Sequence, residues 1–535
     1  MRGRMGTHQR KRIWVISILF VTSFTGGCGE PGRTKPEPTA DLDVTIGSLV
    51  EVFSPDAIIV EGYGLAGGLR GTGSAECPPE IRGYLKRYIP TQLPEHKIST
   101  EKLISSRKTA VVLLEGIMPA AKNQHFDVRV AAHPDTQTTS LEGGLLYGAE
   151  LKRAGGFGLT TKVLATAKGP VFIDTIGTSG TDKKAGYILA GGTVLDEYKV
   201  RLALRPDYRT AGLIRNKLNE RFGEGTAEAL SDSLIELKVP AKYKEQKQRF
   251  ISIVEATYLG ETLEATKERI ETFVRKLGSS EDKEQSEITL EAIGNKCLPK
   301  LAGLLNSSND EVRLRAARCM LNLDSERGLE TLRTIAMDKS SAYRIEALEA
   351  ITSGARRNDA AVITRRLLRD QNFDIRFAAY ENLRKLDDIT IMRSLIAEDF
   401  YLEQISQTTY KAIFVSRSGL PRIVLFGSPI YCHEDIFVQS ADGNITIDAR
   451  AGAKYVTVIL KLGHRPEIPP IQFKSSFEVS DIIQTLCESA IVKEGRAVRP
   501  GLNVSYADAI YILKQMCEQG AIEAEFRAGP LPKID

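Results

Sequence analysis

The sequence predicts an α+β fold, in which a mixed α/β core in two blocks is interrupted by an inserted α-solenoid. Runs of β-branched and other apolar residues, bounded by glycine and proline, occur between residues 44 and 277 and return after residue 410. Between the two blocks an apolar-Arg-x-x-Ala motif recurs at Val312, Tyr343 and Ile375, at spacings of 31 and 32 residues. A fixed period of this length is typical of stacked helix pairs. A chain of 535 residues should also divide into several domains.

Residues 1–27 are predicted to be a signal peptide of the lipoprotein type. Basic residues open the chain, and residues 13–24 form an uncharged apolar run that is too short to span a bilayer comfortably. Small residues then precede Cys28, as in a bacterial lipobox, although Thr25 stands where a leucine is usual. Cys28 is therefore the candidate lipidation site and membrane anchor, with an ordinary cleaved leader as the alternative. Residues 28–43, which contain three prolines, are predicted to be a tether.

The net charge argues against a nucleic-acid partner. The whole chain carries +4, but five positive residues precede Cys28, so the chain from Cys28 onward has a net charge of −1. No cluster of Lys and Arg with interleaved aromatic residues stands out, as a nucleic-acid interface would require. With 42% hydrophobic residues, the mature chain is expected to be globular rather than disordered.

The first block, residues 44–277, combines strands with one clear amphipathic helix. The helix is expected at residues 209–222, with Thr210 as its N-cap and Gly223 as its end. A polar segment, residues 278–287, is expected to be a linker to the solenoid. Strands are expected at residues 110–114, 126–130 and 234–240.

The inserted solenoid is predicted over residues 285–405. Each apolar-Arg-x-x-Ala motif opens an amphipathic helix and follows another helix across a short polar turn. The period and composition resemble short HEAT repeats, which need about three copies to bury their apolar faces. Cys297 and Cys319 fall on these helices and are expected to be small core residues. As an insertion, the segment is expected to be replaceable by a short linker without unfolding the core.

The second block, residues 410–535, returns to the mixed pattern. Strands are expected at residues 422–426, 436–439 and 444–447, and helices at residues 481–486 and 506–516.

The segment from residue 60 to residue 73 carries six glycines, which imply a tightly folded, irregular backbone. Three of them match the G-x-G-x-x-G dinucleotide fingerprint after a strand, and Glu80 stands near the expected acidic position. That fingerprint requires a helix to begin inside it, whereas here the glycines continue where the helix would have to form. A dinucleotide-binding enzyme is therefore a weak alternative. The six residues are Gly62, Gly64, Gly67, Gly68, Gly71 and Gly73.

The strand at residues 126–130 raises the question of a metal site. His125, Asp127 and His133 would share one strand face. Arg129 between them would repel a cation, and zinc needs three or four convergent ligands. No metal site is expected, and this strand face is interpreted as solvated.

The glycine-rich segment is similar to the N-terminal signature of the flagellar P-ring protein family. Ser74 departs from that signature, since the family usually has Asp there. Later segments resemble the family in the same order along the chain, so the resemblance covers most of the mature chain in two blocks, with the repeats between them. The matching segments include Gly62-Tyr63-Gly64-Leu65, Gly68-Leu69, Gly71-Thr72-Gly73, Gly169-Pro170-Val171 and Gly443-Asn444-Ile445-Thr446.

The resemblance implies a structural protein of the bacterial periplasm rather than an enzyme, without catalytic residues and without a cofactor. Many copies of such a protein form the P ring of the flagellar basal body, a bushing around the rod. The implied partners are further copies of the chain, the rod and L-ring proteins, and peptidoglycan. The alternative is a P-ring-like envelope lipoprotein outside the flagellum, which would act as a protein-interaction scaffold through its repeats.

Two sets of candidate site residues follow from the resemblance. Some P-ring proteins carry a cysteine pair, which implies a disulfide between Cys432 and Cys517, with Cys487–Cys517 as the rival. The six glycines are a candidate for one side of a head-to-tail contact between ring subunits, because their backbone allows a neighbour to approach closely. An internal turn is the other interpretation of the same glycines.

Overall fold

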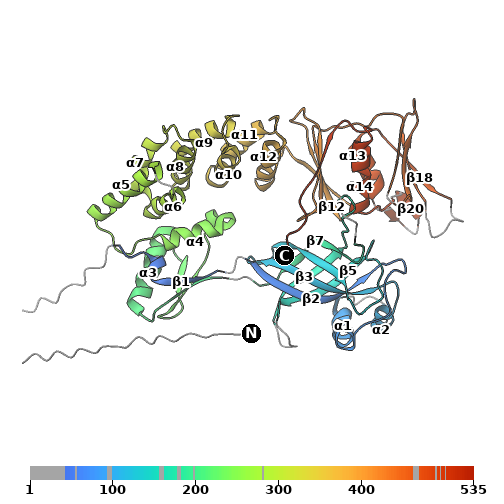
Figure 1. Cartoon of the computed structure of the whole chain (residues 1–535), viewed down its shortest axis with the longest axis horizontal. Coiled ribbons are helices and arrows are strands. Elements are labelled where there is room, and N and C mark those ends of the chain that lie inside the picture. Colours follow the sequence, from blue (N-terminus) through green and yellow to red (C-terminus); the bar gives the residue numbers. More distant parts are fainter. Residues whose placement is uncertain are drawn as a thin grey trace, which may run out of the picture. The chain divides into compact units, whose positions relative to one another are not determined.

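The computed structural model describes residues 43–54, 57–92, 99–155, 162–177, 182–196, 199–279, 282–440, 442–461, 469–488, 491–493, 496–499 and 502–534. Its elements are drawn in Figure 1. The expected signal peptide, Cys28 and nearly all of the expected tether lie outside these residues. Among the helices that are described, none has the length and apolar character needed to span a bilayer.

A closed six-stranded barrel forms the first part of the chain. Its strands pair antiparallel around the barrel in the order β2-β3-β4-β7-β6-β5. Alternating apolar side chains fill the interior, as the period of two along a strand requires. The strands are β2 (Ala57–Gly67), β3 (Ala110–Pro119), β4 (His125–Ala132), β5 (Leu145–Arg153), β6 (Val163–Pro170) and β7 (Ala185–Val194).

Two helices cover one side of the barrel (Figure 1). They are α1 (Pro79–Gln92) and α2 (Thr100–Ile104). Leu85 and Ile89 of α1 and Ile104 of α2 pack on Leu65 and Val111, which point outward from β2 and β3. The expected strands at residues 110–114 and 126–130 are confirmed as parts of β3 and β4.

A four-stranded sheet with two helices follows the barrel. The sheet order is β1-β8-β10-β9, with β1 (Val50–Phe53), β8 (Val200–Leu204), β9 (Ala227–Ala229) and β10 (Leu234–Leu237). Two short 3-10 turns, η1 (Ile46–Ser48) and η2 (Ala241–Gln246), and helix α4 (Lys247–Glu255) complete this region.

The expected amphipathic helix is α3 (Tyr208–Phe222), and its N-cap differs from the expectation. Asp207, not Thr210, caps it, since the Asp207 carboxylate accepts hydrogen bonds from the backbone N–H groups of Arg209 and Thr210. Gly223, with φ of 103°, ends the helix as expected.

A run of helices then forms the repeat array, and the helical motifs recognised in the sequence are confirmed. Successive helices pack as antiparallel neighbours joined by short turns (Figure 1). The elements are α5 (Leu263–Ser279), α6 (Lys283–Ile293), η3 (Asn295–Cys297), α7 (Leu298–Leu304), α8 (Asp310–Asn322), α9 (Arg327–Met337), α10 (Arg344–Gly354), α11 (Arg357–Leu367) and α12 (Phe373–Lys385).

The structure corrects both ends of the expected array. The polar segment at residues 278–287 is not a linker along its length, because α5 continues to Ser279 and α6 begins at Lys283. The array ends at Lys385 rather than at residue 405, because two strands follow. These strands, β11 (Met392–Ile396) and β12 (Phe400–Ile405), pair antiparallel within the C-terminal sheet.

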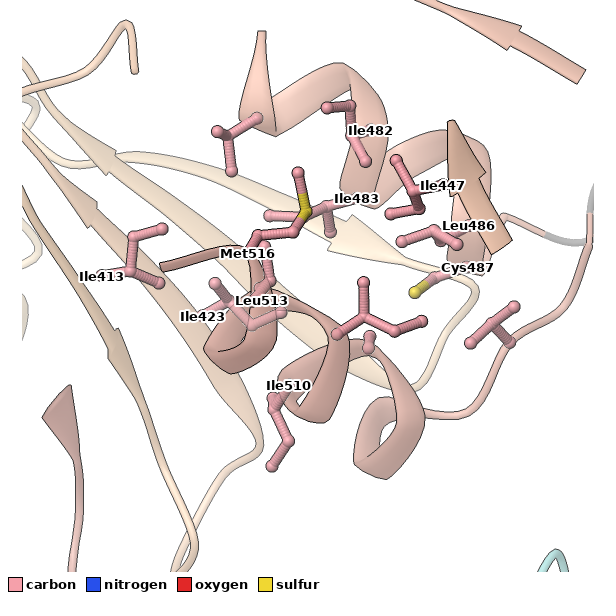
Figure 2. Close-up of a cluster of buried hydrophobic side chains, with 14 of the residues drawn as sticks. Ile413, Ile423, Ile447, Ile482, Ile483, Leu486, Cys487, Ile510, Leu513 and Met516 are labelled. Atoms are coloured by element: carbon pink, nitrogen blue, oxygen red, sulfur yellow. The ribbon is translucent and has the colours of Figure 1, made fainter. Parts of the chain in front are cut away.

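The C-terminal region contains two larger sheets with two helices between them, and a two-stranded sheet of β19 and β20. The first sheet has the order β11-β12-β14-β13-β21, and the second has the order β15-β16-β17-β18. Figure 2 shows α13 and α14 side chains, including Ile483 and Met516, meeting Ile413 and Ile423 of the first sheet and Ile447 of the second. The bounds are β13 (Ala412–Val415), β14 (Arg422–Phe426), β15 (Ile436–Gln439), β16 (Ile445–Ala449), β17 (Val456–Leu460), β18 (Ile471–Ser475), α13 (Val479–Cys487), β19 (Ile491–Lys493), β20 (Arg496–Arg499), α14 (Tyr506–Glu518) and β21 (Glu525–Ala528).

Candidate functional site

The glycine-rich segment begins inside a regular strand, which corrects the expectation of an irregular backbone there. Gly62, Gly64 and Gly67 belong to β2, and Gly62 pairs with Leu114 of β3. A Cβ at Gly62 would lie 2.3 Å from the backbone oxygen of Glu150 on β5, the strand that closes the barrel. The glycine is needed because two strands approach closely at the seam of the barrel.

Two other glycines also lie close to atoms of the same chain, Gly67 against the end of a tyrosine side chain and Gly73 against backbone. A Cβ at Gly67 would lie 2.2 Å from the Tyr147 hydroxyl oxygen, and one at Gly73 would lie 2.0 Å from the Thr109 backbone oxygen. The Gly73 N–H also donates to Arg107 at 2.9 Å, so this backbone is already paired within the chain. Since Gly62 to Gly67 lie along a strand and α1 begins only at Pro79, the segment does not form the strand-turn-helix that a dinucleotide fingerprint needs.

Gly68 and Gly71 form the exposed turn that follows β2. Both have positive φ, 79° and 96°, which favours glycine. Nothing lies within 4 Å of a Cβ built at Gly71, and Arg70 beside it is also exposed. We call residues 68–71 the glycine turn. It is the part of the segment where a second molecule could approach without displacing the chain's own atoms.

Strand β4 holds the side chains that raised the metal question, and they point to a different role. Asp127 is half-buried, and its carboxylate accepts hydrogen bonds from the backbone N–H groups of Ala190 at 2.7 Å and Gly419 at 2.8 Å. Burial raises the pKa of Asp127, and these two hydrogen bonds oppose that shift. The interpretation of this face as solvated is therefore wrong at Asp127. Within the described residues, no three His, Cys, Asp or Glu side chains converge as a metal site.

The turn between β13 and β14 fastens the C-terminal region to the barrel. Gly419 in this turn donates to Asp127, and Arg417 pairs with Asp174 at 3.0 Å. On α14, Lys514 donates to the Ile176 carbonyl at 3.0 Å, and the Tyr506 ring lies 6.0 Å from that of Phe172. Because these residues come from both parts, the barrel and the C-terminal region are held together by three polar contacts and one aromatic contact.

A buried ionic cluster joins the start of the helical array to α4. Glu287 and Glu291 on α6 are fully buried. The Arg249 guanidinium on α4 donates to Glu287 at 2.7 Å and also pairs with Glu291, and Arg318 on α8 donates to Glu287 at 2.5 Å. The buried Tyr243 hydroxyl donates to Glu291 at 3.1 Å. We call this set the first junction.

Electrostatics explain why α6 can bury two carboxylates. Burial alone would raise the pKa of Glu287, but Arg249 and Arg318 lower it to about 2. The charged form is therefore the one that the fold holds. This pairing is the physical reason that a polar run in the sequence becomes a buried helix.

The last helix of the array packs on the C-terminal sheet, and we call this contact the second junction. Tyr380 of α12 is fully buried and donates to the buried carboxylate of Glu403 on β12. Arg384 and Arg393 also pair with Glu403, at 3.1 and 3.3 Å. One apolar cluster continues from the repeats into the sheet through Ile405, Ala412, Phe414, Val424 and Phe426.

A cavity of about 240 Å³ lies between α4, α5 and α6. Ser252, Glu255 and Tyr258 contribute to its lining, and burial raises the pKa of Glu255. Pockets for drug-sized ligands are usually 300–1,000 Å³, so this cavity is smaller than that class of site.

The cysteines implied as a disulfide lie in one apolar cluster of the C-terminal region. Cys432 and Cys487 are buried there and Cys517 packs against it, and all three are free thiols in this structure. Burial raises the pKa of Cys432 to about 11 and that of Cys517 to about 12. Both pairings remain predictions. Cys28 lies outside the described residues.

Comparison with known proteins confirms the resemblance to P-ring proteins for the first part of the chain. Residues 46–270 match the family described as flagellar P-ring protein, and residues 298–384 match HEAT repeats. The first match runs from η1 into α5 and so contains the barrel and the four-stranded sheet. The expected resemblance of the second block lies outside this match and stays a prediction.

Individual relatives agree with the family match. The flagellar P-ring protein of Thermotoga maritima is 32% identical over 212 residues, which cover 36% of this chain and 60% of the relative. Those of Desulfotalea psychrophila and Albidiferax ferrireducens are 28% and 29% identical, covering 46% and 49% of this chain and 65% and 68% of the relatives. The chain thus spans between 54% and 65% of the length of the first three relatives that it matches.

Proposed function

We propose that this chain is a structural subunit of the flagellar P ring, assembling in the periplasm as a bushing around the rod. The observation that carries the proposal is the match of residues 46–270 to flagellar P-ring proteins, because it spans two folded parts rather than a short motif. Rod and L-ring proteins, peptidoglycan and other copies of the chain are the proposed partners. Cys28 is proposed as an additional lipid anchor to a membrane.

The fold suits a bushing because its parts are rigid. A closed barrel leaves no unpaired strand edge, and its pairing continues around the whole circumference. The contacts of Asp127, Arg417 and Lys514 fix the C-terminal region to this barrel. A ring under mechanical load needs such fixed parts, and it needs no reacting group.

Identical subunits that close a ring must use two different patches on each subunit. We propose the glycine turn, residues 68–71, as one of these patches, because its exposed backbone leaves room for a neighbour. The crowding of Gly62 and Gly73 against the backbone oxygens of Glu150 and Thr109 favours a role within the folded subunit for those two glycines.

Replacing Gly71 with Asn separates the two roles. Asn tolerates positive φ, and its side chain would enter open space, so the monomer should keep its fold. Gly62→Ala is the matched comparison, since its Cβ would collide with the Glu150 backbone oxygen at the seam of the barrel and should lower the melting temperature. Ring loss with an unchanged circular dichroism melt for Gly71→Asn supports the contact. Rings that still form with Gly71→Asn contradict it.

Isolation of basal bodies tests the function itself. The chain should be found by mass spectrometry in basal bodies purified from its own cells, and deletion of its gene should abolish motility and the P-ring density in micrographs. If the chain is found in the envelope but not in basal bodies, and motility persists, the P-ring proposal fails. That result would favour the envelope scaffold, which the HEAT match motivates.

A further inference from the structure

Two cysteines meet inside the first helical repeat. Cys297 ends η3, directly before α7, and Cys319 lies near the end of α8. Both are fully buried and belong to one apolar cluster together with Leu301 and Met320. The repeat therefore brings together two thiols that are separated by 21 residues along the chain.

The two thiols face the same turn of α6. The Cys297 thiol donates to the Leu290 carbonyl at 3.4 Å, and the Cys319 thiol lies 3.9 Å from the Glu287 carbonyl. These acceptors are three residues apart, so they are neighbours on one helix face. The two side chains are also close enough for Cys297 to influence the pKa of Cys319, which is raised. Because both thiols lie against neighbouring carbonyls of one helix, they are placed to approach each other, and a disulfide would bring the sulfurs to about 2.05 Å.

We propose that Cys297 and Cys319 form a disulfide in the exported protein, which ties the start of α7 to α8. This inference rests on the proposed periplasmic location, because disulfides persist in oxidising compartments and are rare elsewhere. The bond would lock the α7–α8 hairpin against α6. Since α6 carries Glu287 and Glu291, the disulfide would reinforce the first junction.

The oxidant is a disulfide of the thiol–disulfide oxidoreductase class, or oxidised glutathione in vitro. One cysteine thiolate attacks a sulfur of the oxidant and releases one thiol. The second cysteine thiolate then attacks the mixed disulfide and releases the other thiol. Two electrons pass to the oxidant, and the two cysteine protons end on its two thiols.

Exchange should occur during folding rather than afterwards. Both sulfurs are inaccessible in the folded chain. Interaction with the Cys297 side chain and burial raise the pKa of Cys319, so little thiolate is present after folding.

The test is refolding of the full chain in a mixture of oxidised and reduced glutathione. The sample is unfolded in denaturant in the presence of an alkylating reagent, digested with trypsin without reduction, and analysed by mass spectrometry. The expected product is a linked pair of peptides, residues 297–300 and 319–327, that separates after reduction. Alkylated thiols at both positions in this sample would overturn the inference.

Cysteine variants and urea unfolding test the proposed pairing and its effect on stability. Cys297→Ser should leave Cys319 alkylated, whereas Cys487→Ser should leave the 297–319 link intact. Midpoints of urea unfolding should be lower in reduced than in oxidised wild type, and this difference should be smaller in Cys297→Ser/Cys319→Ser. Equal midpoints in oxidised and reduced wild type would contradict the proposed stabilising role.

The same digest of the chain from cell envelopes separates this inference from the proposed function. A link in both samples supports both proposals. A link after refolding but free thiols in the cellular protein would place the chain in a reducing compartment. That outcome would overturn the periplasmic function while leaving the pairing intact.

Discussion

The helical array meets the rest of the chain at two junctions that use different chemistry. At the first junction, two buried glutamates on α6 are neutralised by arginines from α4 and α8. At the second, α12 covers an apolar sheet, and Glu403 is a buried carboxylate that keeps a tyrosine and two arginines as partners. The array is thus part of the folded core at both ends.

The comparison of the two junctions separates two contributions to the docking of an inserted domain: the specificity of the contact and its stability. A buried ion pair adds little net stability, because desolvation offsets attraction, but it is costly to break. It therefore fixes which surfaces meet. Burial of apolar area contributes the favourable free energy, at roughly 25 cal/mol per Å². The first junction should thus respond most to a single charge change, and the second should tolerate the loss of one polar contact.

Deletion of the whole array should have the largest effect and tests whether it is a separable insertion. Replacing residues 283–385 with a Gly/Ser linker would expose Phe414 and Phe426 and leave Arg249 without its carboxylates. We expect loss of cooperative thermal unfolding by circular dichroism, or insoluble protein. Deleting only residues 325–356 keeps both junctions and should leave a cooperative transition. A soluble, cooperatively folded chain without residues 283–385 would show that the junctions are dispensable.

Glu287→Gln should destabilise the chain more than any other single charge removal at either junction. The amide keeps the shape but removes the buried charge that pairs with Arg318 and, beside Glu291, with Arg249. Breaking a buried pair in this way typically costs about 3–5 kcal/mol of unfolding free energy. Urea unfolding measures it. The control is Glu330→Gln, which removes an exposed partner of Arg333 and should cost less than about 1 kcal/mol. Equal effects of the two substitutions would contradict the buried role.

The pH dependence of the unfolding free energy should show the contribution of the Glu287 carboxylate. Because the folded-state pKa of Glu287 is about 2, below its ordinary value of 4.5, its contribution to stability is present above pH 4.5. It is lost as the pH falls toward 2, and the difference in pKa corresponds to about 3 kcal/mol. The gap in unfolding free energy between wild type and Glu287→Gln should therefore narrow between pH 5 and pH 2. A constant gap would show that Glu287 titrates normally.

The contrast between the junctions also explains what the sequence could predict. The repeat helices were predictable because their apolar period is local, and Val312, Tyr343 and Ile375 mark it directly. The buried start of α6 could not be predicted, because the polar segment before residue 288 resembles a solvated linker. Its neutralising partners, Arg249 and Arg318, are 38 and 31 residues from Glu287 along the chain. The one local signal was the set of apolar residues that follows, Ile288, Leu290, Ala292 and Ile293.

The glycines of the candidate site also show that contacts between residues far apart in the sequence could not be predicted. Their number in the sequence predicts close backbone approach, and Gly62 confirms it. The partner strand, β5, is nearly ninety residues away, so the barrel seam was not visible in the local pattern. Asp127 was likewise interpreted as a solvated strand residue because its partner, Gly419, is 292 residues away.

Tyr380→Phe should produce the smallest loss of stability among these variants, because the second junction should tolerate the loss of one polar contact. The substitution removes the hydroxyl that donates to Glu403 but keeps the ring, which packs 5.6 Å from the Phe426 ring. Glu403 would retain Arg384 and Arg393, so its charge would stay paired. We expect a loss of about 1–2 kcal/mol, within the range for a hydrogen bond to a charged group and below that for Glu287→Gln. Tyr343→Phe, in a half-buried position where no hydroxyl bond is formed to a buried carboxylate, is the control and should be within about 0.5 kcal/mol of wild type. A loss for Tyr380→Phe as large as that for Glu287→Gln would mean that the second junction also depends on its charge network, and the division between the two junctions would fail.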